Sequence, residues 1–306
     1  KYSKKYQQLV SGTKNILDQI HAYQNLASAY RLAESDSARF FWELALELLN
    51  DSPYKGQNIH ASVLNNLGEL ALNNENYINS IELLTLSIDY QRKKQALNPN
   101  LHQTTLYNLA EAYRWSEDYA SADSIYKNLI TDIIEDIAHN FTFLSDTEKM
   151  SFYNAHVDFI DGFASFGLEV TGALPLQSAE QPYISKDILG RLYNLQLQTK
   201  AIILNASKRM KSSILNSGDT ALINIYTLWE MRKNQFAQAL LNENIDEDTF
   251  QNLKYKIEEN EQWLTAHSRR FQSGFVFDTT DWRSIQKNLK PNEAAVEMIR
   301  LIDGLV

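Results

Sequence analysis

The residue types that carry out most enzyme chemistry are few and scattered in this sequence. No two of its six histidines are three or four residues apart, so no helix face brings two imidazoles together. The adjacent carboxylates Glu258 and Glu259 point in different directions on a helix and cannot share a substrate. The absence of cysteine excludes a cysteine nucleophile, a disulfide and a cysteine-ligated zinc within this chain. Metalloprotease, serine-hydrolase, phosphate-loop and dinucleotide motifs are also absent. We therefore expect no catalytic residue, no metal site and no cofactor, and a role in binding.

Asparagine is the residue whose placement points to a binding role. Asn25, Asn66 and Asn108 each stand directly before a leucine in three similar stretches. An Asn amide both donates and accepts hydrogen bonds, so it can pair with an extended peptide backbone in two directions. The alternative is that these amides bond to a neighbouring helix and hold the helices together. The residues themselves leave both interpretations open.

These asparagines belong to an internal repeat. The stretch LNNLGELA around Gly68 returns as LYNLAEAY around Ala110, a step of 42 residues. Nine residues after each of these small residues comes an aromatic one, Tyr77 and then Tyr119. A fainter copy, YQNLASAY, lies upstream. Repetition at a fixed step indicates a repeat architecture.

Each repeat predicts two helices that pack closely. Apolar residues recur at helical spacing in both copies, and a second apolar helix follows each of them. The small residues Gly68 and Ser80, and again Ala110 and Ala122, let the two helices approach. Pro53 and Pro99 are expected to mark the ends of second helices. Because one hairpin cannot bury its own apolar face, successive hairpins should stack into a solenoid with a concave and a convex side.

This pattern resembles the tetratricopeptide repeat in its longer form of about 42 residues, over roughly residues 20–132. The resemblance implies an α-solenoid that binds a protein or peptide partner in its concave groove. The first helix of each hairpin would line that groove. The peptide-binding residues predicted from the register are Gln24, Asn25, Arg31, Asn65, Asn66, Glu69, Asn73, Tyr107, Asn108, Glu111 and Arg114.

Beyond the repeats, the sequence predicts a region of long helices. The expected helices lie at about 185–215, 219–241 and 248–271. The second and third keep apolar residues at a coiled-coil spacing and should pair as an antiparallel hairpin. Gly218 and Asp219 suit the end of one helix and the start of the next. The segment 172–182 holds two prolines and is predicted to be a hinge between the repeats and this region.

The last part of the chain changes character. A short helix is predicted at 281–289, followed by a turn and by a strand-like stretch that starts at Ala294. The predicted fold is therefore all-α with a short β element at the C-terminal end. Its domains are helical repeats over 1–140, a helical region over 141–275 and the beginning of an α/β domain over 276–306.

The order of these segments is similar to that of bacterial proteins that join tetratricopeptide repeats to a CHAT domain, a caspase-like cysteine peptidase fold. The stretches LSDTEK, SILNSGD and WRSIQKNLKPNEAAVE carry this resemblance. In that family the catalytic His and Cys lie downstream of the first strand, so no position here inherits those roles. Since the sequence also begins with Lys1, we expect a piece of a longer protein.

The resemblance implies a non-catalytic scaffold that binds a protein or peptide and regulates a CHAT-type peptidase domain attached in cis. A stand-alone peptide receptor or scaffold, with no peptidase attached, is one alternative. The other is part of an enzyme whose catalytic residues lie beyond this chain.

Composition narrows the class of partner. The formal net charge of −9, from 29 basic and 38 acidic residues, argues against nucleic acid, whose phosphates are bound by Lys and Arg. No apolar run approaches the roughly 18 residues that a membrane span needs, and no signal-peptide pattern opens the chain. We therefore expect no membrane contact and a cytoplasmic location.

Overall fold

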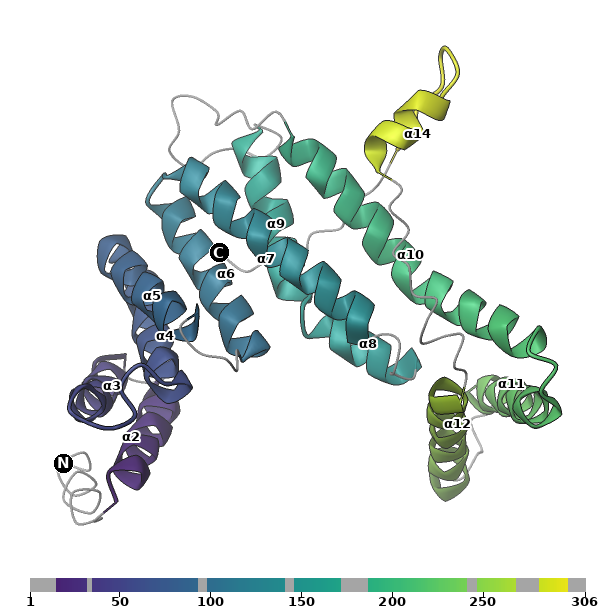
Figure 1. The fold of residues 1–306 in the computed structure, drawn as a ribbon, viewed down its shortest axis with the longest axis horizontal. Coiled ribbons are helices and arrows are strands. Elements are labelled where there is room, and N and C mark those ends of the chain that lie inside the picture. Colours follow the sequence, from purple (N-terminus) through teal and green to yellow (C-terminus); the bar gives the residue numbers. More distant parts are fainter. Residues whose placement is uncertain are drawn as a thin grey trace. The chain divides into compact units, whose positions relative to one another are not determined.

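The computed structural model describes residues 15–31, 35–92, 98–140, 146–171, 187–240, 247–267 and 281–296. Every regular element in these residues is an α-helix, and none of them forms a strand (Figure 1). The predicted all-α fold is therefore confirmed. The chain divides into two compact units, with a division between Asp132 and Ile133. The domain boundaries expected at residues 140 and 275 stay predictions.

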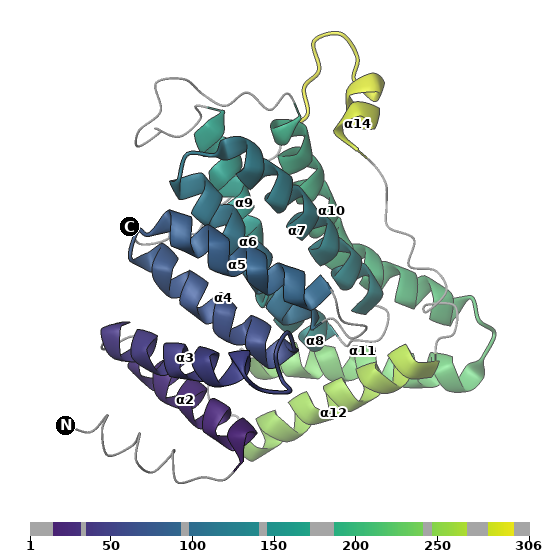
Figure 2. The same ribbon diagram turned by 60° about the vertical axis from the view of Figure 1, so that its left-hand side comes forward.

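The first unit is a succession of helices that pack in chain order. Each helix from α2 to α6 contacts the next, and α4 also contacts α6 (Figure 2). Residues of α7 up to Asp132 belong to this unit. The helices are α2 (Ile16–Tyr30), α3 (Ser35–Asn50), α4 (Asn58–Asn73), α5 (Tyr77–Arg92), α6 (Pro99–Trp115) and α7 (Tyr119–Asn140).

The close approach of α4 and α5 depends on Gly68. A Cβ atom added there would lie 2.6 Å from Cγ of Leu84 on α5, closer than real Cβ atoms come to a neighbour. The hydroxyl of Ser80 donates to the carbonyl oxygen of Gly68 at 2.8 Å. Ala110 and Ala122, the small residues of the next repeat, are both fully buried. The small positions of the sequence repeat therefore lie at helix contacts, as predicted.

The turns after α4 and α6 share one backbone conformation, 42 residues apart. Glu75 has a φ of 59° and Glu117 a φ of 64°, in the left-handed region that non-glycine residues rarely adopt. The backbone N–H of Asn76 closes the first turn at 2.9 Å and that of Asp118 closes the second at 3.0 Å, each on a carbonyl five residues earlier. Both side chains then accept a hydrogen bond from the first turn of the following helix. The period read from the sequence is thus also present in the backbone.

A buried polar chain ties α4, α5 and α6 together. The hydroxyl of Ser87 on α5 donates to the carbonyl oxygen of Ala61 on α4 at 2.7 Å. The amide nitrogen of Gln91 donates to Ser87 and to Thr105 on α6, both at 3.1 Å. Nδ1 of His102 lies 3.2 Å from the amide oxygen of Gln91, and burial lowers the pKa of this imidazole. Each group is buried or half-buried and has a partner, as buried polar groups require.

The second unit consists of the end of α7 and the helices that follow it. These are α8 (Asp146–Asn154), α9 (Val157–Val170), α10 (Ile188–Leu215), α11 (Thr220–Leu240), α12 (Glu247–His267) and α14 (Trp282–Asn288).

Helices α11 and α12 form the predicted antiparallel pair. The ring of Phe236 stacks on that of Phe250, with centroids 4.8 Å apart. Earlier on α11, Leu222 and Trp229 share an apolar cluster with Leu264, which lies later on α12. Contact positions thus advance on one helix as they recede on the other, which defines an antiparallel hairpin.

The start of α11 follows the predicted capping chemistry. Gly218 has a φ of +71°, in the left-handed region. The carboxylate of Asp219 accepts hydrogen bonds from the backbone N–H groups of Ala221 at 2.9 Å and Leu222 at 3.2 Å. Asp219 therefore caps the helix that it was predicted to start.

Three expectations for the remaining segments have different outcomes. Pro99 does not end a second helix: α5 ends at Arg92, and Pro99 is the first residue of α6, behind the capping side chain of Asn98. The first helical position suits proline because its missing N–H has no partner there. The predicted hinge at 172–182 lies outside the described residues. Residues 294–296 form no strand, and the rest of the expected β element is likewise outside them.

Candidate functional site

Most of the predicted binding residues form a polar strip across α2, α4 and α6. We define the polar strip as Arg31, Asn65, Asn66, Glu69, Asn108, Glu111 and Arg114. Its members come from the first helix of each predicted hairpin or from the end of that helix. Side-chain contacts connect them in three groups: Arg31 with Glu69, the three asparagines, and Glu111 with Arg114. The strip therefore gathers residues from three places in the sequence.

Three asparagine amides form a relay at the centre of the strip. The amide nitrogen of Asn108 on α6 donates to the amide oxygen of Asn65 on α4 at 3.3 Å. The nitrogen of Asn65 lies 3.5 Å from the oxygen of Asn66, a long hydrogen bond. Asn65 is 3% exposed and Asn108 is 7% exposed, whereas Asn66 is half-buried. The structure thus ties Asn65 and Asn108 across the helices, and no described residue accepts a hydrogen bond from the nitrogen of Asn66.

An ion pair joins the strip to α2. Nη1 of Arg31, at the C-terminal end of α2, donates to Oε1 of Glu69 on α4 at 2.8 Å. The side chains are 46% and 27% exposed, so water screens their attraction and the pair adds little to stability. Its effect is to neutralise both charges at this end of the strip.

Glu111 is the most heavily bonded residue of the strip. Its carboxylate accepts hydrogen bonds from Nη1 of Arg114 at 3.2 Å, from Nε1 of Trp115 at 3.2 Å and from the hydroxyl of Tyr126 on α7. Tyr126 is fully buried, and burial followed by the charge of Glu111 raises its pKa well above the ordinary value. Glu111 therefore links α6 to α7, and Arg114 holds its carboxylate from within α6.

The other predicted residues stand apart from these contacts. Gln24 is half-buried, and Asn25 and Asn73 are exposed; none of the three makes a hydrogen bond or ion pair to a described residue. The ring of Tyr107 meets that of Tyr126 edge to face, with centroids 6.4 Å apart. Gln24, Asn25 and Asn73 thus keep their polar groups available to a ligand.

The sequence prediction missed Trp115, which lies beside the strip at the end of α6. Its side chain is 41% exposed although it is large and apolar. The guanidinium of Arg114 lies 5.3 Å from the centre of its ring, and the bond to Glu111 fixes the indole. An aromatic residue next to a predicted binding residue was the available signal, because exposed tryptophan is enriched at binding hot spots.

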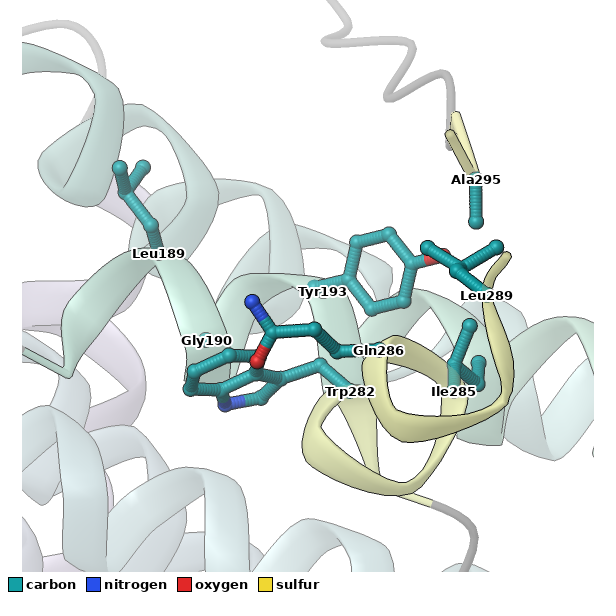
Figure 3. Close-up of a pocket in the computed structure, with 8 residues that line it drawn as sticks. All are labelled: Leu189, Gly190, Tyr193, Trp282, Ile285, Gln286, Leu289 and Ala295. Atoms are coloured by element: carbon teal, nitrogen blue, oxygen red, sulfur yellow. The ribbon is translucent and has the colours of Figure 1, made fainter. Parts of the chain in front are cut away.

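A second candidate site lies within the second unit, between α10 and α14. Figure 3 shows the residues that line a cavity there. Its volume is about 330 Å³. Its walls are largely apolar, with Tyr193 and Gln286 as the polar side chains. Its lining residues are Leu189, Gly190, Tyr193, Trp282, Ile285, Gln286, Leu289 and Ala295.

Two contacts hold α14 at this cavity. The backbone N–H of Trp282 donates to the amide oxygen of Asn194 at 2.7 Å, and Arg283 pairs with Asp187 at 3.0 Å. The indole packs so tightly that a Cβ atom on Gly190 would lie 2.2 Å from Nε1 of Trp282. The cavity therefore offers a largely apolar surface that a ligand could contact.

The described residues contain no cluster of three or more histidine, cysteine or acidic side chains that could hold a metal. None of the described helices is both long and apolar enough to cross a membrane. No family model and no curated protein matches this chain. The tetratricopeptide and CHAT resemblances therefore continue to depend on the residues alone.

Proposed function

We propose that residues 20–132 form a tetratricopeptide-like α-solenoid whose polar strip binds an extended segment of a partner protein. The recurrence of one left-handed turn at a 42-residue step carries this proposal, because repetition of a hairpin is what builds a solenoid. The polar strip supports it, since α2, α4 and α6 hold equivalent places in successive hairpins.

Under this proposal the predicted residues have two roles. Those that are buried or fully bonded position the binding surface, and the exposed or half-buried ones contact the partner. The positioning residues are Asn65, Tyr107, Asn108, Glu111 and Arg114. The contacting residues are Gln24, Asn25, Arg31, Asn66, Glu69 and Asn73.

The test is a displayed peptide library screened against the chain, followed by affinity measurements on the selected peptides. Asn66→Ala removes an amide with an unused donor and should weaken binding about tenfold. Asn128→Ala is the matched control, since Asn128 is an exposed asparagine on α7 outside the strip. Failure to select any peptide, or equal affinity for both variants, would contradict the proposal.

We further propose that the bound partner regulates a CHAT-type peptidase domain attached in cis, and that this chain is itself non-catalytic. The sequence likeness at 282–297 supports this role. The test measures peptidase activity of the longer protein with and without a selected peptide, in the original protein and in the Asn66→Ala variant. We expect the peptide to change the rate only in the original protein. Turnover by this chain alone would contradict a non-catalytic role.

A further inference from the structure

The first helices of the hairpins carry little charge. Helices α2, α4 and α6 contain four acidic or basic side chains in all, whereas α3, α5 and α7 contain twelve. Amide and hydroxyl side chains fill the polar positions of the first helices. Those exposed or half-buried on them include Gln24, Asn25, Ser28, Ser62, Asn66, Asn73 and Thr104. The side of the chain that would meet a partner is thus polar with few charged side chains.

The charges that do occur on the strip are already compensated. Arg31 faces Glu69 at 2.8 Å, and Arg114 faces Glu111 at 3.2 Å. A carboxylate of a ligand would compete with the chain's own carboxylate for either guanidinium. No described lysine lies on α2, α4 or α6 to supply a further positive charge. The strip therefore has no uncompensated cation with which to hold an acidic tail or a C-terminal carboxylate.

Trp115 supplies an apolar contact next to this strip, whose charges are paired with one another. It follows Asn108 by seven residues, so the two lie on the same side of α6. Arg114 and the bond from the indole to Glu111 hold the ring in place, and 41% of the side chain remains exposed. A fixed and exposed indole is a surface on which an aliphatic or aromatic side chain can pack with little loss of side-chain entropy.

We infer that the strip recognises an internal, uncharged and extended peptide segment with an apolar side chain that packs on Trp115. The backbone of the segment pairs with the amide of Asn66, whose nitrogen is the unused amide donor among the residues of the strip. Charge contributes little to this recognition, so the affinity is nearly independent of salt. This inference is built on the peptide-binding function proposed above and specifies the chemistry of its ligand.

The experiment uses the whole chain and a displayed library of peptides about twelve residues long, about 40 Å when extended. Selected peptides are synthesised in two forms, one with free termini and one acetylated and amidated. Their affinities are measured at about 50 mM and about 500 mM NaCl, which brackets weak and strong screening. We expect low net charge, equal affinity of both forms, and less than about a twofold change with salt.

Two variants with matched exposure test the apolar contact. Trp115→Ala should lower the affinity for the selected peptides about tenfold. Phe40→Ala removes a ring that is 42% exposed on α3 and should leave affinity unchanged. Circular dichroism of both variants verifies that they are folded.

The outcomes separate this inference from the function it extends. Acidic peptides, a requirement for a free C-terminal carboxylate, or a tenfold loss with salt would overturn the inference while leaving peptide binding intact. Equal affinity of the Trp115→Ala and Phe40→Ala variants would also overturn it. Recovery of no peptide at all would overturn both the inference and the proposed function.

Discussion

The two compact units hold their helices together over different distances in the sequence. In the first unit, the hydroxyl of Ser80 bonds a carbonyl 12 residues earlier, and Asn108 bonds an amide 43 residues earlier. In the second, the backbone N–H of Trp282 bonds a side chain 88 residues earlier and Arg283 a carboxylate 96 residues earlier. A repeat specifies its own neighbours, whereas the place of α14 depends on contacts that no local pattern encodes.

Two sets of buried asparagines, one in each unit, differ in whether their amide nitrogens are paired. Asn65 and Asn108 satisfy each other across two helices of the first unit. Asn260 on α12 of the second unit is 8% exposed, and its amide nitrogen has no hydrogen-bond partner. An unsatisfied buried donor lowers stability, while a paired one adds to it modestly. The four predictions that follow test this contrast between the units.

The largest effect is expected from the two glycines at close contacts. Gly68→Val forces side-chain atoms against Leu84 in the first unit and should lower the free energy of unfolding by about 3 kcal/mol. Gly190→Val meets the indole of Trp282 and should instead displace α14. Urea unfolding combined with hydrogen exchange of α14 peptides distinguishes the two. An equal loss of global stability in both variants would contradict the expected difference between the two units.

Two tyrosine–glutamate bonds give the next largest difference. Tyr126→Phe removes the hydroxyl donor of Glu111, whose side chain is 12% exposed and keeps only its bonds to Arg114 and Trp115, and should cost about 2 kcal/mol. Tyr226→Phe removes the bond to Glu230 at 2.6 Å, but that side chain is 45% exposed, so water replaces the hydroxyl and the cost should be about 0.5 kcal/mol. Thermal unfolding of both variants measures the difference. A larger loss for Tyr226→Phe would show that burial does not set these energies.

Replacing the two buried asparagines by leucine should change stability in opposite directions. Asn260→Leu removes an unsatisfied donor at nearly constant volume and should raise stability by about 1 kcal/mol. Asn108→Leu leaves the amide oxygen of Asn65 without its donor and should lower stability by about 1 kcal/mol. Chemical denaturation gives both values, and the same sign for the two would contradict this interpretation.

The smallest effect is a difference in pH dependence. Burial lowers the pKa of His60 and His102 below the ordinary 6.5 in the first unit. The folded state then binds fewer protons than the unfolded state, so stability is complete above pH 6.5 and falls as pH drops below it. In the second unit, hydrogen bonds from Tyr226 and Lys211 lower the pKa of Glu230 below 4.5, so its contribution is lost only in more acidic solution.

Hydrogen exchange measured from about pH 7 down to about pH 4 reports on each unit separately. As the pH falls, the first unit should lose protection before the second unit does. A His102→Gln variant, which cannot gain a proton on its side chain, should loosen less on acidification. Unchanged behaviour of that variant would assign the pH dependence to other groups.

The sequence predicted the features that depend on nearest neighbours. The contact of Gly68 with Ser80 followed from two small residues 12 positions apart, and the cap at Asp219 from its own side chain. The helical pair α11 and α12 followed from apolar spacing. In each case the partners are close in sequence or repeat at a fixed period, so a local pattern contains the information.

Details that depend on helix rotation were not predictable. Asn66 and Asn108 hold equivalent places in the repeat, yet Asn108 bonds to Asn65. Adjacent residues of a helix point about 100° apart, so a small rotation of α4 decides which amide faces α6. The cavity beside Gly190 was missed for a related reason. It forms only where α14 returns to a helix that lies far from it in the sequence.

The paired left-handed turns at Glu75 and Glu117 have a genetic consequence. Loss of residues 76–117 would join Glu75 directly to Asp118, which makes the same turn bond and the same helix cap as Asn76. Copying that segment in frame creates an equally regular junction. Unequal recombination could therefore lengthen or shorten the chain by one hairpin without inventing a loop. The length of the proposed binding surface would then depend on the number of hairpin copies, which one recombination event can change.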